Sequence, residues 1–588
     1  MDAIVSDKSI SGNLLLLSAY FLLNNFFSKP ANCLSQSTAY FLQNVGMKVL
    51  ILDAVTTKIV SMVYSQTQIL EQEIYLVKDI SAPPNKDDVH HMKATIFVQP
   101  TMENIRLLEK ELASGRYSEY HLFFSNVLSR DMLVKLARAD SRELVRQVLE
   151  YYADYMAINE DFYQLGAEKS LSLSKASRSL DSSVYERNVQ GILSALLSFK
   201  RCPSQIRYQV TSDLAQRLAS SVSMVTGDRQ IFDFPRQEGP MLLILDRRDD
   251  PITPLLTQWT YQAMVHELLG LHDNRVNLKH LETKNEKKGE KKGEPKDPNI
   301  TEAVLSCTQD KFFAKHRYSN FGDLGAAVNE LLADYQKLSK SNEKLSSIED
   351  MKKAMENMPE FRAKSINVSK HVAILSELAR MVDKNQLLII SSLEQEIACS
   401  YDHSTHKREL FDIIAKEGVK DADKLRLAAL FIIRYESYNE IGVIKKCLSQ
   451  QNISNSQLAT LDAILEYAGE SKRAPGLFTQ GSIVTKFSKV FNQSTEVQNV
   501  YTQHQPLLSN TLDSILKGKF KDSAFPLVNP STANKPSDIF VFMVGGSTYE
   551  EAAKVAEFNA ANPSMRVVLG GSCIHNSTSF LREVNANF

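Results

Sequence analysis

The sequence predicts an α/β protein with two α/β domains, whose sheets are rich in parallel strands, and a third, mainly helical domain inserted in the second. Three observations support this prediction. Short apolar runs alternate with amphipathic helical patterns in the first part of the chain, as in a doubly wound parallel sheet. Apolar runs of the same kind return near the C-terminal end. Between them, from about residue 250 to 475, the pattern is helical almost throughout.

The first α/β domain is predicted over residues 46–140, after an N-terminal extension of residues 1–45. Short, continuous apolar runs are typical of buried parallel strands. Here they are Met47–Asp53, Glu73–Val77, Ala94–Pro100 and Tyr120–Asn126. Thr101–Leu112 and Ser129–Ala139 are predicted helices that begin at a hydroxyl residue suited to an N-cap. One face of the second helix should carry Met132, Leu133, Leu136 and Ala137.

The second α/β domain is predicted to be split into residues 141–246 and 475–588. Its first part opens on a helical pattern, Arg142–Met156, and closes on the apolar strand Pro240–Asp246. That part is incomplete as a sheet. The missing strands are predicted to return as Asp538–Gly546 and Met565–Gly571, two apolar runs closed by glycines. The helical domain, residues 247–474, is therefore inserted between the two parts.

One segment of the helical domain, residues 282–298, contains no hydrophobic residue. Because it cannot bury apolar surface, it is predicted to be a disordered loop. Its Lys and Glu residues nearly balance, which argues against a nucleic-acid-binding tail.

The composition excludes several classes of function. The 588 residues carry 68 Lys and Arg against 69 Asp and Glu, so there is no overall attraction to nucleic acid. The six cysteines are far apart and form no C-x-x-C pair, which predicts no disulfide framework, no metal site and no other cofactor. In Asn13–Phe27 the apolar core, Leu14–Leu23, is shorter than the ~20 residues that a membrane span needs. The sequence thus predicts a cytoplasmic protein.

The first candidate for chemistry is a charged group within Leu242–Leu256, made of Asp246, Arg247, Arg248, Asp249 and Asp250. An Asp at a strand end can be a nucleophile or a magnesium ligand in phosphoryl transfer. The two arginines would partly neutralise such a site, and no complete phosphate-binding loop accompanies it. The structural alternative is a helix capped by Thr253, with Pro254 at its first position. That helix would turn Leu256, Trp259, Ala263 and Leu268 inward.

The second candidate is Phe542–Val555, which the pattern predicts to be a strand, a glycine turn and a helix capped by Ser547 or Thr548. Backbone N–H groups at a helix N-terminus attract anions. However, neither G-x-G-x-x-G nor G-x-x-x-x-G-K-[ST] is present. Glu550 and Glu551 would occupy the first turn, complement the helix dipole and repel a phosphate. A structural glycine turn is favoured.

The third candidate is a group of nucleophilic side chains near the C-terminal end, Ser572, Cys573 and His575. Such a group is typical of Cys/His catalysis, but no carboxylate can be assigned to orient the histidine. Buried or capping roles are favoured. The sequence therefore predicts no catalytic residue and a protein that is not an enzyme.

Several segments closely resemble signature segments of the Sec/Munc (SM) family of SNARE regulators. They include Leu242–Leu271, Val541–Ala552, Val567–Val584 and Tyr501–Leu508. The resemblance covers the chain from about Gly46 onward and is greatest to the vacuolar-protein-sorting branch, which serves the trans-Golgi network and endosomes.

This resemblance implies an arch-shaped molecule of three domains that acts without catalysis in vesicle docking and membrane fusion. It implies binding to a syntaxin-like Qa-SNARE, to the assembled SNARE bundle and to a vesicle R-SNARE. Peripheral association with trans-Golgi network, endosomal and vesicle membranes would follow from those SNAREs. The charged group Asp246–Asp250 would then hold the junction of the second and third domains and not a metal.

The resemblance also implies two binding surfaces. The N-terminal peptide of the Qa-SNARE would dock on the first domain at Leu133, Leu136 and Glu150. An apolar notch beside a carboxylate suits a peptide with one hydrophobic and one basic residue; core packing is the other interpretation of Leu133. The second surface is a helical hairpin around Ile348–Val372. There Pro359 is expected to interrupt the helix and act as a hinge, or to be a static loop proline.

An enzyme remains the alternative function. It would be a magnesium-dependent phosphoryl-transfer or nucleotide-binding α/β enzyme that uses Asp246 and the Gly545–Gly546 turn. A scaffold of the SM type and such an enzyme differ in whether Mg²⁺ with a nucleotide stabilises the fold.

Overall fold

The computed structural model describes residues 46–83, 90–167, 170–171, 181–229, 231–232, 239–278, 302–343, 348–478, 501–528 and 536–587. The predicted N-terminal extension and the predicted loop 282–298 lie outside these residues. The chain divides into two compact units. Unit 1 comprises Met1–Asp246, Gly518–Ser547 and Val555–Ile574, and unit 2 comprises Arg247–Lys517, Thr548–Lys554 and His575–Phe588. One division thus falls between Asp246 and Arg247, inside the charged group.

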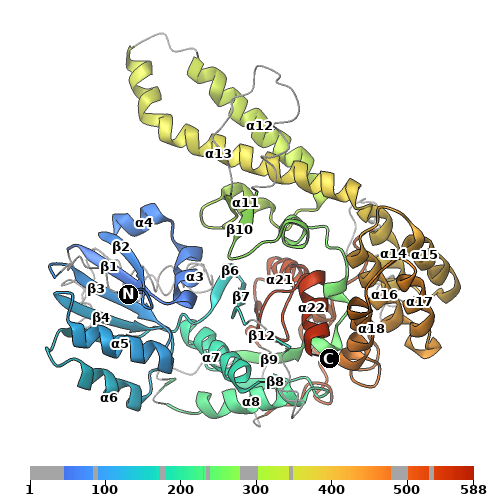
Figure 1. The fold of residues 1–588 in the computed structure, drawn as a ribbon, viewed down its shortest axis with the longest axis horizontal. Helices are drawn as coiled ribbons and strands as arrows, with labels where there is room; N and C mark the ends of the chain where they lie inside the picture. Colours follow the sequence, from blue (N-terminus) through green and yellow to red (C-terminus); the bar gives the residue numbers. More distant parts are fainter. Residues whose placement is uncertain are drawn as a thin grey trace. The chain divides into compact units, whose positions relative to one another are not determined.

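The first sheet of unit 1 has five parallel strands in the order β2-β1-β3-β4-β5. The strands are β1 (Lys48–Leu52), β2 (Ile74–Asp79), β3 (Lys93–Val98), β4 (Glu119–Phe124) and β5 (Val145–Glu150). Helices α3 (Ala54–Val63) and α4 (Gln66–Glu71) follow β1, whereas α5 (Met102–Ser114) follows β3 and α6 (Arg130–Ala139) follows β4. Right-handed connections in opposite directions along the sheet place α5 and α6 on the face away from α3 (Figure 1). The predicted doubly wound arrangement is confirmed.

The core of this sheet follows the apolar runs of the sequence. The side chains of β1 are all buried, and those of β3 and β4 are buried after the first residue. On α5, Ile105, Leu108 and Leu112 are at most 1% exposed, which confirms the predicted inward face. The Thr101 hydroxyl accepts the N–H of Asn104 and caps this helix, as predicted.

Two sequence predictions about this sheet are wrong. The run Glu73–Val77 forms an edge strand, β2, on which Tyr75 and Val77 are exposed, rather than a buried strand. The predicted helix Arg142–Met156 is instead β5 and the beginning of β6 (Met156–Asn159). Apolar residues four apart imitate a helix there, but the open edge of β4 offers backbone hydrogen bonds that override a weak local preference. The first sheet therefore extends beyond residue 140.

The second sheet of unit 1 joins strands from the two ends of the chain. Its order is β6-β7-β13-β12-β9-β8. The remaining strands are β7 (Phe162–Gln164), β8 (Gln205–Tyr208), β9 (Met241–Asp246), β12 (Asp538–Val544) and β13 (Arg566–Gly571). Because β9 pairs in parallel with β12, and β12 with β13, the prediction that the missing strands return near the C-terminal end is confirmed. Helices α7 (Ser182–Ser198) and α8 (Asp213–Thr226) also belong to this half of unit 1, and α8 packs on β8 and β9.

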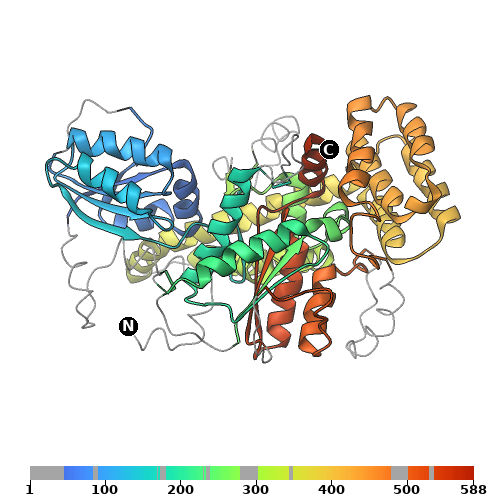
Figure 2. The same ribbon diagram turned by 90° about the horizontal axis from the view of Figure 1, so that it is seen from below.

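Unit 2 is mainly helical, as predicted. Helices α12 (Phe321–Glu343) and α13 (Ile348–Lys384) run side by side as a long hairpin (Figure 1). A bundle of five helices follows (Figure 2): α14 (Leu387–Cys399), α15 (His403–Ala415), α16 (Asp421–Arg434), α17 (Ile441–Ser449) and α18 (Asn455–Ala468). The shorter elements are η3 (Arg247–Asp249), η4 (Thr253–Leu255), α9 (Tyr261–Met264), the π-helical turn Val265–Leu269, β10 (Arg275–Asn277), β11 (Glu302–Val304), α11 (Lys311–His316), η6 (Glu436–Tyr438) and α20 (Leu507–Leu516). Helix α22 (Ser577–Asn587) packs on α18, and α21 (Tyr549–Ala561) contributes its first turns to this unit.

Two predicted features of unit 2 differ in the structure. Thr253 does not cap a long helix: it begins the single 3₁₀ turn η4, and the predicted helix is replaced by η4, α9 and the π-helical turn. Leu256, Trp259 and Ala263 are nevertheless buried as predicted, while Leu268 is half-buried. Pro359 does not interrupt the helix, because α13 continues through it from Ile348 to Lys384. Within the described ranges, no helix has the length and apolar content to cross a membrane.

Candidate functional site

The predicted peptide-binding residues lie at the carboxyl end of the first sheet, in unit 1. Strand β4 leads through a short loop into α6, and β5 lies beside β4 with Phe124 paired to Glu150. Helix α6 begins after Ser129, whose hydroxyl accepts the N–H of Met132. This topology brings the start of α6 and the end of β5 to the same edge of the sheet.

The Glu150 carboxylate is exposed but held in place. Its Oε1 accepts the backbone N–H of Leu128 at 2.8 Å, and its Oε2 accepts the hydroxyl of Tyr152 at 2.9 Å. Burial raises the pKa of Tyr152, and the hydrogen bond to Glu150 and its charge raise it further. Each carboxylate oxygen can accept a second hydrogen bond. The group can therefore bind a basic side chain without losing its anchors.

The apolar part of this surface differs from the prediction. Leu133 is 44% exposed and does not pack in the core, whereas Leu136 is 2% exposed and belongs to the core under the sheet. The prediction that Leu136 lines a peptide pocket is therefore wrong, because its side chain packs in the core of the first sheet and leaves no surface for a peptide. Val127 and Val134 are 36% and 40% exposed on the same loop and helix, and sequence reasoning missed both. An exposed Val has no local signal that separates it from a core Val.

The carboxylates of the charged group bind different partners. Asp246, in unit 1, accepts the Ser212 hydroxyl at 2.6 Å, and its N–H is bound by Gln209. In unit 2, Asp249 accepts the backbone N–H of Ala474 at 3.1 Å. The Asp250 carboxylate binds Thr253 and Leu507. Each carboxylate thus has its own hydrogen-bond donors, which favours the structural interpretation over a shared metal ion.

Arg247 forms a fully buried ion pair with Glu551 in unit 2. Its Nη2 lies 2.5 Å and 2.6 Å from the two carboxylate oxygens, and neither side chain is exposed. Burial by itself lowers the pKa of Arg247, but the carboxylates of Glu551 and Asp250 raise it above its ordinary value. Nη1 of Arg247 also donates to the Asp250 carbonyl at 3.0 Å. The arginine therefore joins η3 to the start of α21.

Asp250 joins the η4 turn to the start of α20 in unit 2. Its Oδ2 accepts the Thr253 hydroxyl at 2.7 Å and the backbone N–H of Leu507 at 3.1 Å. The Thr253 hydroxyl also lies 3.2 Å from Nε2 of His504. Against the opposing effect of burial, Arg247 and His504 lower the pKa of Asp250. Sequence reasoning missed Glu551 and His504 as partners of this group, because they lie hundreds of positions away.

The glycine turn before α21 has no room for a phosphate. Thr548 and Glu551 form a reciprocal cap: the Thr548 N–H donates to Glu551 at 2.9 Å, and the Thr548 hydroxyl accepts the Glu551 N–H at 3.3 Å. The prediction that a hydroxyl residue caps this helix is confirmed, with Thr548 as the cap. The Glu551 carboxylate occupies the position that an anion would take at a helix N-terminus.

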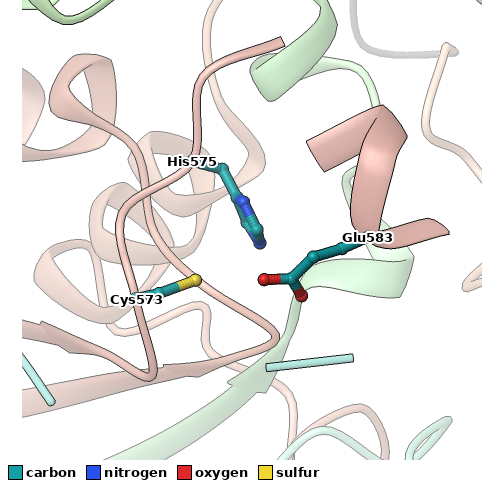
Figure 3. Close-up of side chains that lie close together, drawn as sticks. All are labelled: Cys573, His575 and Glu583. Atoms are coloured by element: carbon teal, nitrogen blue, oxygen red, sulfur yellow. The ribbon is translucent and has the colours of Figure 1, made fainter. Parts of the chain in front are cut away.

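The nucleophilic side chains of the third candidate follow β13. The Ser572 hydroxyl, which is buried, donates to Oδ1 of Asn188 at 2.7 Å. Nδ1 of His575 lies 3.1 Å from the Ser579 hydroxyl. Figure 3 labels Cys573, His575 and Glu583; in unit 2, the possible ligand atoms of His575 and Glu583 lie within 4.8 Å of one another. Glu583 is a neighbouring carboxylate that the sequence did not indicate, because it lies two turns along the following helix.

Comparisons with known proteins agree over nearly the whole chain. The family described as the Sec1 family matches residues 48–583. The chain is 42% identical over 548 residues to vacuolar protein sorting-associated protein 45 of Homo sapiens, which covers 92% of this chain and 93% of the relative. It is 40% identical over 552 residues to the homolog of that protein in Arabidopsis thaliana, with 92% and 94% covered. A solved structure described as the SM protein Vps45 in complex with the Qa SNARE Tlg2 gives a TM-score of 0.85 at 38% identity and covers 98% of each chain.

Proposed function

Because this chain belongs to the Sec1 family, we propose that it regulates the assembly of SNARE complexes in vesicle docking and fusion by binding a syntaxin-like Qa-SNARE. The observation that carries this proposal is the similarity, over 98% of both chains, to a Vps45 structure that contains a Qa-SNARE. The protein acts by binding rather than by catalysis. The separate partners of Asp246, Asp249 and Asp250 and the occupied helix start at Thr548 support this reading over the enzyme alternative.

The finer parts of the proposal concern partners and location. The assembled SNARE bundle and a vesicle R-SNARE are further partners. The protein works at trans-Golgi network, endosomal and vesicle membranes, which it reaches peripherally through its SNAREs. The names of the relatives, which place them in vacuolar protein sorting, support this location.

The Qa-SNARE N-terminal peptide binds beside Glu150. Leu133 and Val134 offer exposed apolar contacts on α6, and Val127 offers another on the loop before it. The anchored Glu150 carboxylate provides the acceptor for a basic residue of the peptide. Leu136 supports α6 from beneath and does not touch the peptide.

The hairpin of α12 and α13 presents the second SNARE-binding surface. A continuous helix as long as α13, which has 37 residues, can align two SNARE helices along its length. Pro359 is the hinge of this hairpin: proline removes one backbone hydrogen bond and lowers the resistance of the helix to bending at that turn.

Calorimetry with purified Qa-SNARE cytosolic regions tests the proposal. A panel that represents each intracellular compartment is titrated into the full chain, and one or two members should bind with a Kd of about 1 μM or tighter. An R-SNARE cytosolic region alone serves as the weak-binding comparison. Failure of every Qa-SNARE to bind, by calorimetry and by pull-down, would overturn the proposal.

A further inference from the structure

Unit 2 contains a pocket that the proposed function does not use. It has an empty volume of about 490 Å³, part of it open to solvent. Five elements surround it: the end of α13, the starts of α14, α16 and α22, and the π-helical turn. Its charged and amide side chains are Glu267, Asn385, Lys420, Asp423 and Arg426.

Two buried side chains at this pocket have hydrogen-bonding atoms without a protein partner. Asn385 is 2% exposed, and its side-chain amide forms no hydrogen bond with a described residue. Arg426 is also 2% exposed, and its Nε has no partner among the described residues. Buried polar groups are nearly always satisfied in folded proteins. Groups of this kind beside a cavity indicate a site for a polar ligand.

The starts of α14 and α16 add hydrogen-bond donors to one side of the pocket. Their N-cap residues, Gln386 and Lys420, provide no side-chain cap, although the helices have 13 and 14 residues. Nε2 of Gln386 donates to the Glu417 carbonyl at 3.2 Å and so joins the start of α14 to the loop before α16. Free N–H groups at a helix start carry partial positive charge. With Asn385 and the Lys420 ammonium, they suit a carboxylate.

The opposite charge is provided by Glu267. Its carboxylate accepts the Ser577 N–H at 3.0 Å and also the Ser577 hydroxyl, which fixes its position at the start of α22. Each oxygen keeps one free lone pair. The second acidic lining residue, Asp423, is already paired to Arg426 at 2.9 Å. Glu267 is therefore the carboxylate that can receive an ammonium group.

The unpaired charges of the lining residues balance. Arg426 is already paired with Asp423 and with the buried Glu394, each at 2.9 Å. Among the described lining residues, Glu267 and Lys420 remain without an ion pair, one of each sign. A ligand with one charge of each sign satisfies both sides.

We propose that this pocket binds a small zwitterion with one carboxylate and one ammonium group, of the free α-amino acid class. The carboxylate is held by Asn385, by Lys420 and by the starts of α14 and α16. The ammonium is held by Glu267. This site is independent of SNARE binding, so its failure and that of the proposed function are separate results.

A thermal-shift screen of the full chain tests the proposal. Each of the twenty standard L-amino acids is added singly at about 5 mM, because a ligand that binds the folded state raises the unfolding midpoint by mass action. Inorganic phosphate and putrescine at the same concentration are the anion-only and cation-only probes. At least one amino acid should raise the midpoint, and neither control should match it. Calorimetry then gives its Kd.

Substitutions place the binding at this pocket. Lys420→Met removes the exposed ammonium and should weaken the Kd of that amino acid about tenfold or more. Asn385→Leu removes the amide at similar volume and should have an effect of similar size. Lys416→Met, at an exposed lysine outside the pocket, is the matched control and should bind like the wild type. The proposal is overturned if no amino acid raises the midpoint, if phosphate or putrescine does so better, or if Lys420→Met binds unchanged. Because Lys420 is exposed, that variant remains informative even where Asn385→Leu does not fold.

Discussion

Arg247 and Glu551, 304 positions apart in the chain, meet in a two-oxygen ion pair from which solvent is excluded. A buried charge that loses its partner is strongly destabilising, whereas replacement of both charges by apolar side chains is tolerated far better. The pair therefore joins the segment after β9 to the start of α21. Each of the two buried charges is tolerated only while the other is present.

We expect Arg247→Met to lower the free energy of unfolding by about 3–5 kcal/mol, because it leaves the Glu551 carboxylate buried and unpaired. The double variant Arg247→Met with Glu551→Leu should recover much of this loss. Urea unfolding followed by circular dichroism measures both. The exposed pair Arg275–Glu302, with side chains 45% and 49% exposed, is the control: Arg275→Met should change stability by less than about 1 kcal/mol. A similar small effect at Arg247 would contradict the prediction.

Leu133→Arg should abolish capture of the Qa-SNARE N-terminal peptide without unfolding the protein. The side chain is 44% exposed, so a charge there costs little stability, but it removes a central apolar contact and adds a cation where the peptide brings one. Calorimetry should give a Kd weakened about 100-fold or more.

Met224→Arg makes the same change at a residue of α8 that is 75% exposed, and it should bind the peptide like the wild type. If Leu133→Arg and the wild type bind the peptide equally well, the peptide does not bind at this surface.

Pro359→Ala should strengthen binding to the vesicle R-SNARE. A proline inside a helix costs roughly 3 kcal/mol through its missing N–H and its clash with the preceding turn. Alanine restores the N–H and removes the clash. It therefore stiffens α13, which runs through this position. A pull-down with the R-SNARE cytosolic region measures the effect, and Pro83→Ala, at an exposed residue far from the hairpin in sequence, is the matched control. Equal or weaker binding by Pro359→Ala argues against the hinge.

Stability should fall as the pH drops below about 6.5, the ordinary pKa of histidine. Burial lowers the pKa of His371, although its hydrogen bond to Asp310 at 2.9 Å opposes this. The unfolded chain therefore binds a proton at His371 before the folded chain does, and acid favours unfolding. One such group contributes at most about 1.4 kcal/mol per pH unit.

Thermal midpoints at pH 7.5 and pH 5.5 measure this dependence. His371→Gln should make it shallower, whereas His91→Gln, at an exposed histidine, should leave it unchanged. A midpoint that rises on acidification in the wild type would reverse the sign and refute the account.

ATP with Mg²⁺ should not raise the unfolding midpoint. The helix start that could hold a phosphate is filled by Glu551, which Thr548 and Arg247 already bind. A differential scanning fluorimetry titration measures this. A saturable rise that depends on Mg²⁺ would restore the enzyme alternative.

The fold was more predictable from the sequence than the site. Buried parallel strands such as β9 and β12 are continuous apolar runs, so their pattern is unambiguous even when their partners are distant. Strand β5 was not predictable in this way, because its half-exposed residues repeat at a helical spacing and only the edge of β4 decides its conformation.

The residues of the candidate site depend on details that a local pattern does not contain. Leu133 and Leu136 are the same residue type three positions apart, but one faces solvent and the other the core. No motif indicates that Glu551 is the partner of Arg247, because only the fold of the whole chain brings the two residues together. The Asn385 amide could be recognised as unsatisfied only after the starts of α14 and α16 were placed beside it.

The position of β9 between β12 and β8 has a consequence for synthesis on the ribosome. One neighbour of β9, the strand β8, is made just before it, but the other, β12, emerges almost three hundred residues later. During that interval the apolar edge of β9 has no native strand to pair with, and such an edge invites aggregation. We therefore expect chaperones to bind the nascent chain until Asp538–Val544 is translated, and a chain that ends before that strand to lack the native partner of β9.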